Sequence, residues 1–410
     1  MARLMEGQPD RKKRRKFLMV SVISNLGLLF AFKYFDFFMD SATGIMQQFN
    51  VITKLPELKV LLPVGISFYS FQALSYTIDV YEGRHKAEHH LGYFALYITY
   101  FPQLVAGPIE RFDRLAPQLR AYHKPVYENF ANGFRLILYG LFIKMAVADN
   151  LGEYVEQIYN QPQAYSSISI LVGLLFYSFQ IYADFFGYST IAVGAALLMG
   201  VRLMDNFRTP YLATSISEFW KRWHISLSTW FRDYLYIPLG GNKVHWFRWA
   251  LNILIVFTVS GLWHGANWTF VIWGGFFGFV FLIEHLINKH ILKGGLEQSG
   301  FWKGASILKT FVLVTFAWIF FRSPDINTAQ TIIKSLASNW QMTDNFAVEY
   351  SVVGVFLLFV LTDIMLFNSR FDTWCSKRPL VIRWAVYFVF LFAVLALSGT
   401  DNQPFIYFQF

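Results

Sequence analysis

The sequence predicts an all-α, polytopic integral membrane protein, and three observations support that fold class. Its 410 residues are 55% apolar and 20% aromatic but only 15% charged, against roughly 25% charged in a typical soluble domain. Long apolar stretches recur from one end of the chain to the other, as lipid requires of spanning segments. They are continuous instead of alternating, which argues against a β-barrel. A chain this apolar is also not intrinsically disordered.

The charge balance fits a membrane protein better than a nucleic-acid binder. The net charge is +9, and basic residues are expected in the cytoplasmic loops of membrane proteins. We therefore expect contact with membrane lipid and none with nucleic acid. The single cysteine, Cys375, permits no internal disulfide, and the sequence lacks a convincing metal-ligand, phosphate-loop or hydrolase motif. No metal and no bound cofactor are predicted.

The chain opens with a polar, basic segment at residues 1–16, which includes the run from Arg11 to Lys16. An apolar stretch follows from Phe17 to about Phe38. By the positive-inside rule, the N-terminus lies in the cytoplasm. The stretch is too long for a signal-peptide core and no small-residue cleavage site follows it, so we interpret it as a first retained span.

Further hydrophobic segments bring the total to about ten. They cover approximately residues 61–80, 91–107, 130–148, 167–200, 249–263, 268–288, 306–322, 350–367 and 380–398. The loops on both sides of segment 91–107 are basic, and the segment contains Pro102 and Gly107. We therefore predict that it is re-entrant, which requires protein or a water-filled cavity around the freed backbone groups.

Loop charges then place residues 201–248 at the cytoplasmic face as an amphipathic region, and 249–288 as a hairpin that enters from the same side. The first arm of the hairpin, about 15 residues, would be ~22 Å long as a helix, short of a ~30 Å hydrocarbon core. The turn after it would then lie inside the membrane. Because no repeat or linker divides the chain, we predict a single domain over 1–410.

That turn carries the sharpest candidate residue, His264, which lies between Trp263 and Gly265. An ionisable residue at membrane depth is a functional candidate because burying it is costly. A neutral histidine that hydrogen-bonds across a helix interface is the equally weighted alternative. As a catalyst it would suit general-base work, since a neutral imidazole near pH 7 can take a proton from a hydroxyl.

Two further polar positions stand out. His224 lies in the aromatic and charged stretch 217–240, most of which we interpret as an amphipathic segment at the membrane boundary. A second histidine could orient a substrate or share a proton path. Asp184 interrupts segment 167–200, where it either contacts substrate or satisfies backbone or tyrosine groups at a break near Gly187.

Several motifs in order resemble the membrane-bound O-acyltransferase (MBOAT) family, and within it the alginate O-acetyltransferase AlgI-like branch. The motifs span nearly the whole chain and are Leu62 to Gln72, Phe101 to Ile109, Arg222 to Ser228, Leu262 to Gly265 and the closing Phe405 to Phe410. The resemblance implies helices around a central tunnel, with His264 at the catalytic centre and His224 as its second key residue. Further tunnel candidates are Asp184, Trp263, Asn267, Ser226 and Arg222.

The resemblance also implies the reaction. The family moves an acyl group from a cytoplasmic thioester towards a hydroxyl, and in this branch acetyl-CoA is the expected donor. The acetyl group would pass to an extracytoplasmic (periplasmic) acetyltransferase partner that finishes a polysaccharide, so we expect a multi-pass protein of the bacterial inner membrane. Members usually begin with extra hydrophobic segments before the run matching Arg11 to Lys16, so we expect either a reading frame assigned from a late start or a truncated protein.

Two alternatives stay open at this point. A teichoic-acid D-alanyl transferase of the same family would take its acyl group from an acyl carrier protein. A transporter or flippase would use broken segments to carry a polar substrate without acyl chemistry. Thioester consumption separates an acyltransferase from a transporter.

Overall fold

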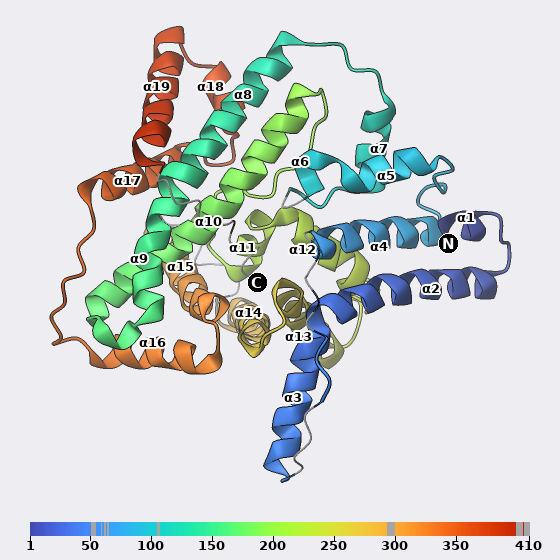
Figure 1. Ribbon diagram of the computed structural model, residues 1–410, viewed down its shortest axis with the longest axis horizontal. Helices are drawn as coiled ribbons and strands as arrows, with labels where there is room; N and C mark the ends of the chain where they lie inside the picture. Colours follow the sequence, from blue (N-terminus) through green and yellow to red (C-terminus); the bar gives the residue numbers. More distant parts are fainter. Residues whose placement is uncertain are drawn as a thin grey trace.

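The computed structural model describes residues 1–50, 55–58, 60, 63, 65–104, 107–292, 300–398 and 405. Within these ranges all regular structure is helical and no strand occurs (Figure 1). The predicted all-α fold class is therefore confirmed. Of the closing motif Phe405 to Phe410, only Phe405 lies within the described residues.

Each of the ten hydrophobic segments contains helix, but fewer are long enough to cross a membrane. Seven described stretches meet that requirement: Arg11–Gln48, Tyr127–Asn160, Ser167–Leu198, Trp246–His264, Trp268–His290, Gly300–Arg322 and Leu380–Leu397. Helix α17 (Tyr350–Met365) is apolar but shorter. The chain is thus a multi-pass membrane protein, while ten segments and a central tunnel stay predictions.

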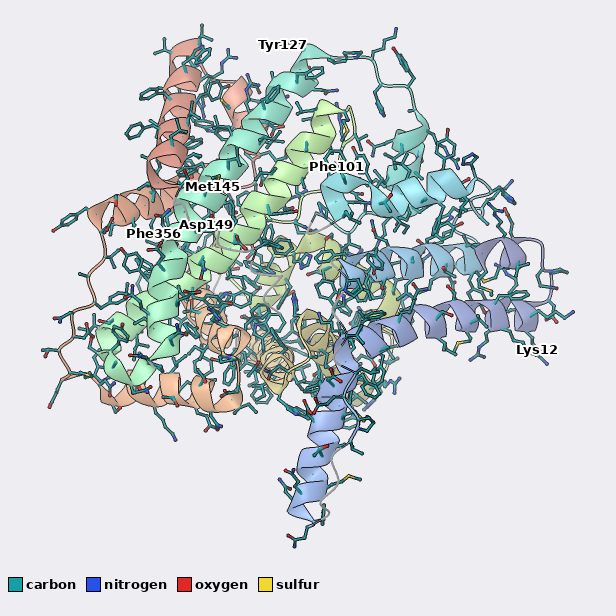
Figure 2. The ribbon with its side chains drawn as sticks, viewed as in Figure 1. Lys12, Phe101, Tyr127, Met145, Asp149 and Phe356 are labelled. Atoms are coloured by element: carbon teal, nitrogen blue, oxygen red, sulfur yellow. The ribbon has the colours of Figure 1, made fainter. Side chains whose placement is uncertain are left out.

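Two of these stretches are composite, because a π-helical turn joins two α-helices in each. The first joins α2 (Arg11–Leu29) through η1 (Phe30–Tyr34) to α3 (Phe35–Gln48). The second joins α8 (Tyr127–Leu141) through η2 (Phe142–Ala148) to α9 (Asp149–Asn160). Met145 and Asp149 mark the middle of this second rod in Figure 2. Single π turns inside long helices are frequent at functional sites.

The central helix is α10 (Ser167–Leu198), in whose most apolar window 67% of the residues are buried. It runs beside α8 (Figure 1), and glycines allow the close approach. A Cβ at Gly140 would lie 2.7 Å from the carbonyl oxygen of Gly187. The prediction of a break near Gly187 is therefore wrong: the helix is continuous there, and the glycine serves packing.

The predicted re-entrant segment consists of two short helices, α5 (Leu91–Thr99) and α6 (Phe101–Leu104), of nine and four residues. Roughly 20 residues are needed for a helix to span the hydrocarbon core. Neither helix can cross, in agreement with the sequence interpretation. Figure 2 marks Phe101 at the start of α6.

The hairpin over 249–288 is formed by α13 (Trp246–His264) and α14 (Trp268–Ile287). The predicted first arm was too short. Helix α13 has 19 residues and is about 28 Å long, which nearly matches a ~30 Å hydrocarbon core. The helix begins three residues before the predicted arm and ends one residue after it. His264 therefore lies in the last turn of α13 and not in the turn that follows, while its depth in the membrane stays a prediction.

Close packing of α13 on α14 depends on Gly261. A Cβ there would lie 2.2 Å from the backbone oxygen of Phe270, so Gly261→Ala must push the two helices apart. Overpacking typically costs about 1–3 kcal/mol, and we expect a lower thermal midpoint for the detergent-solubilised protein. Gly275→Ala is the matched control, because nothing lies within 4 Å of its added Cβ. Equal midpoints for the two variants would contradict this packing.

Region 201–248 corrects a second expectation. It contains η4 (Pro210–Leu212), α11 (Ile216–Arg222), α12 (Ile225–Phe231) and η5 (Arg232–Tyr236). The side chains of its central part are packed in the protein interior, not laid on a surface as an amphipathic segment would be, while its place at the cytoplasmic face stays a prediction. The buried residues include Phe219, Trp223, His224, Ser226, Leu227, Trp230 and Phe231. Aromatic and polar composition resembled an interface segment, and only tertiary packing distinguishes the two.

The remaining helices complete the fold. Helix α15 (Gly300–Arg322) packs beside α14, and α17, α18 (Phe371–Ser376) and α19 (Leu380–Leu397) form one corner (Figure 1). The others are α1 (Ala2–Glu6), α4 (Ile66–Glu82), α7 (Phe112–Arg120), η3 (Pro162–Ala164), η6 (Asn288–Leu292) and α16 (Ile326–Ser338).

Candidate active site

His264 is held in an aromatic enclosure formed by three spanning helices. Its side chain is buried, and its ring centroid lies 5.0 Å from that of Trp263 on the same helix. The rings of Trp273 on α14 and Phe321 on α15 are 5.1 and 5.3 Å away. All three contacts are edge-on, the geometry that aromatic pairs favour. The imidazole is thus fixed in orientation and separated from bulk water.

Gly265 explains how the enclosure closes so tightly. This residue ends α13 in an extended conformation, and a Cβ on it would lie 2.0 Å from the ring of Phe270. The glycine therefore lets an aromatic ring of α14 lie against the end of α13. The sequence interpretation had expected a close approach here by a backbone or a substrate.

His224 occupies the turn between α11 and α12, with a left-handed backbone at φ +41°. A non-glycine residue in that region costs about 1–3 kcal/mol and must be held by its surroundings. Asn206 stabilises this turn through two hydrogen bonds. Its backbone carbonyl accepts from the N–H of Ile225 at 2.9 Å, and its side-chain oxygen accepts from the N–H of Ser226 at 3.3 Å. Strain of this kind is often found at functional positions.

The fold brings the two predicted histidines together from sequence positions forty residues apart. Their ring centroids are 6.4 Å apart, and both rings face Trp263. Phe185 of α10 closes the far side of His224 at 4.7 Å. Burial lowers the pKa of His224 to about 3, so this imidazole is neutral near pH 7. A neutral imidazole has one nitrogen that donates and one that accepts a proton.

Two of the other predicted site residues, Trp263 and Ser226, lie next to the two histidines. Trp263 contacts both histidines, and Phe68 of α4 packs against it at 5.3 Å. Ser226 is completely buried two residues after His224. Its hydroxyl makes no hydrogen bond within the described part of the chain and could receive one from a substrate.

Arg222 and Asn267 have structural partners instead. Arg222 pairs with Glu218 at 2.9 Å, and its guanidinium also donates to the side chain of Asn368 at 3.0 Å. Asn267 caps α14 by accepting from the N–H of Thr269, and it donates to the carbonyl of Pro324 at 2.6 Å. These contacts fix the chain on either side of the two histidines. Direct contact of either residue with substrate stays a prediction.

Asp184 is buried on α10 and pairs with Lys144 of η2 at 2.7 Å. Lys144 also pairs with Asp149, so one ammonium bridges two carboxylates. Neither alternative weighed from the sequence anticipated this ion pair, because Lys144 is 40 positions earlier in the chain. Loss of either partner would leave an uncompensated buried charge, so the ion pair accounts for Asp184 without a substrate.

A cavity of about 500 Å³ adjoins the turn that holds His224. Asn206 and Phe207 form part of its wall, and Phe207 packs against Trp223 at 5.0 Å. Cationic side chains also line it, namely Arg208, Arg370 and Lys377. Within the described residues, no group of three or more His, Cys, Asp or Glu side chains is placed to hold a metal ion.

Two residues that contribute to the site, Asn206 and Lys33, were not predicted from the sequence. Asn206 is a single amide in a loop and carries no pattern that marks it. Lys33 had a signal, because it is a lysine inside the largely apolar stretch from Phe17 to Phe38. Such residues are functional candidates by default, yet we had read that stretch only as a span.

The fold and this site define a multi-pass membrane protein with a buried histidine, His264, at the end of the first arm of the hairpin and a second, His224, beside it. The sequence profile of the MBOAT, membrane-bound O-acyltransferase, family matches residues 82–323. The chain belongs to the membrane-bound O-acyltransferase family and is a membrane O-acyltransferase. The resemblance seen in the sequence motifs is confirmed, and both histidines lie within the matched region.

The names of similar proteins agree with this assignment. The protein named "probable alginate O-acetylase AlgI" of Pseudomonas putida is 34% identical over 97% of this chain and 85% of its own length. The peptidoglycan O-acetyltransferase of Helicobacter pylori is 34% identical over 82% of this chain and 67% of its own. The teichoic acid D-alanyltransferase of Bacillus subtilis is 30% identical over 63% of this chain and 68% of its own.

Proposed function

We propose that this protein takes an acetyl group from cytoplasmic acetyl-CoA and transfers it towards the outer side of the membrane for O-acetylation of a polysaccharide. The observation that carries the proposal is the pair of buried imidazoles of His224 and His264, whose ring centroids are 6.4 Å apart. The relatives named as alginate and peptidoglycan O-acetylating enzymes support the choice of acetyl group and of a polysaccharide.

In the proposed reaction, His264 acts as the general base. Its imidazole takes the proton of an acceptor hydroxyl while the hydroxyl oxygen attacks the thioester carbonyl. The tetrahedral intermediate then collapses, the carbon–sulfur bond breaks, and the imidazolium returns the proton to the leaving thiolate. The products are an O-acyl ester and a free thiol. His224 assists by orienting a reactant or by moving the proton.

An anionic donor is supported by charge. Coenzyme A carries phosphates, and Arg208, Arg370 and Lys377 line the cavity next to the His224 turn. Asp205 and Asp363 line it as well, and Arg208 and Arg370 each lie 3.6 Å from Asp205, so Lys377 is the cation of this lining without a carboxylate partner within the described residues. By the positive-inside rule this basic side faces the cytoplasm, where acetyl-CoA is made. The same reasoning favours the bacterial inner membrane as the location and an extracytoplasmic acetyltransferase as the partner that completes the modification.

A second candidate within the family is D-alanyl transfer from an acyl carrier protein to teichoic acid. The Bacillus subtilis relative favours it, although the match covers a smaller share of this chain than the alginate relatives do. The transporter alternative has lost its support, because the chain belongs to an acyltransferase family.

Measurement of the acyl groups on the surface of whole cells tests the proposal. A strain lacking the chromosomal copy would be complemented with this chain or with its His264→Ala variant, and alkali-released acetate and D-alanine from the cell surface would be measured. We expect the chain alone to restore acetate. Restoration of D-alanine instead would establish the second candidate.

A further inference from the structure

A lysine from an element distant in sequence hydrogen-bonds to the C-terminal end of α13. The ammonium of Lys33, in η1 of the first span, donates to the carbonyl of Trp263 at 2.8 Å and to that of His264 at 3.0 Å. It also reaches the hydroxyl of Ser67 at 3.5 Å. The next residue, Tyr34, donates its hydroxyl to the carbonyl of Leu262 at 2.9 Å. Figure 1 shows the junction of α2 and α3 next to α13.

These contacts satisfy groups that a helix cannot satisfy itself. The last carbonyls of an α-helix lack intrahelical donors, and α13 ends in an extended Gly265 without a backbone capping bond. Two consecutive side chains supply donors to three consecutive carbonyls, Leu262, Trp263 and His264. A cation at a helix C-terminus is further stabilised by the helix dipole.

The position of Lys33 is unusual for a lysine. It lies in a membrane-spanning stretch and makes no ion pair with a carboxylate within the described residues. A charged side chain inside a membrane is costly and marks functional positions by default. Lys309 of α15 contrasts with it, because that ammonium pairs with Glu284 at 2.5 Å. Lys33 is stabilised by the backbone of the histidine-bearing turn instead.

The π turn provides the local reason for this arrangement. Helices α2 and α3 are joined by η1, which contains both Lys33 and Tyr34 in its last two positions. A π turn accommodates one extra residue and changes the direction of the side chains that follow it. Both side chains can therefore reach the end of α13, although they are adjacent in sequence.

We propose that Lys33, together with Tyr34, is a positioning residue that fixes the last turn of α13 and thereby the imidazole of His264. The proposal rests on His264 being the catalytic base. Lys33 acts on the backbone of His264 and has no part in the chemical step itself. A misplacement of about 1 Å in a catalytic group can cost about 100-fold in rate, so the last turn must be held firmly.

Three substitutions of Lys33 separate hydrogen bonding from charge. Lys33→Met removes both, Lys33→Gln keeps a donor without charge, and Lys33→Arg keeps both. Lys309→Met is the control, since it removes an ammonium from another span away from His264. Each protein is assayed in membrane vesicles for acyl transfer from acetyl-CoA, with kcat and KM for the donor determined per amount of folded protein.

We expect Lys33→Met to lower kcat by roughly 10- to 100-fold with KM for the donor within about twofold of wild type. Lys33→Arg should restore most of the rate, Lys33→Gln part of it, and Tyr34→Phe should show a smaller loss. Lys309→Met should match wild type.

A folded Lys33→Met protein with wild-type kcat would overturn the proposal. So would a loss explained wholly by the amount of folded protein, in which case kcat per folded molecule is unchanged. If Lys33→Met does not fold, Lys33→Gln and Tyr34→Phe decide the matter by the same criterion. Absence of transfer by the wild-type protein would instead count against the proposed function, so the two failures are distinguishable.

Discussion

His264→Ala should reduce acyl transfer by roughly 10²- to 10⁴-fold, the usual contribution of general-base catalysis. The imidazole lies in an aromatic enclosure of Trp263, Trp273 and Phe321, and none of these three side chains can act as a base. The measurement is transfer of labelled acetyl from acetyl-CoA in membrane vesicles. Without the base, the acceptor hydroxyl attacks the thioester only slowly.

The control for this prediction lies on the same hairpin. His285→Ala removes an exposed histidine near the other end of α14, where its ring packs on Trp249 at 4.7 Å. This variant should keep wild-type transfer. Near-normal transfer by His264→Ala, at matched amounts of inserted protein, would show that the base is elsewhere.

His224→Phe should lower transfer by roughly 10- to 100-fold at unchanged thermal stability, as expected for a group that assists proton movement. A phenyl ring occupies nearly the space of the imidazole and can keep the ring contacts with Phe185 and Trp263. It removes both ring nitrogens, so the substitution isolates the chemical role of His224 from its packing role. The thermal midpoint and the transfer rate should be measured on the same preparation.

The outcomes separate the two roles of His224 clearly. A loss of rate with an unchanged midpoint supports participation in proton movement or orientation. Transfer within twofold of wild type would mean that this buried ring serves packing alone, with Asn206 holding the turn for structural reasons.

Sequence patterns predicted those features that local composition controls. Apolar length located the helices, and the short, proline-containing segment at 91–107 was correctly interpreted as unable to cross. His264 and His224 were found because an ionisable side chain among aromatics is rare. Their proximity could not be derived from the residues, since it depends on how α11, α12 and α13 meet in space.

Features that depend on tertiary packing could not be predicted from the sequence. The stretch around Trp223 and Trp230 has the composition of a membrane-interface segment, yet it is buried against α4 and α10. Asp184 seemed available for substrate until Lys144 was found beside it. Lys33 is separated from His264 by more than two hundred residues, and no periodicity connects the π turn of one helix with the end of another.

The most direct measurement is transfer of label from acetyl-CoA supplied to inverted membrane vesicles, which expose the cytoplasmic face. With the wild-type protein, we predict alkali-labile O-acetyl label that depends on added acetyl-CoA, and little label in right-side-out vesicles. With His264→Ala, that label should fall to the level of vesicles without the protein. Equal labelling by wild type and His264→Ala would contradict catalysis by the histidine at the end of α13.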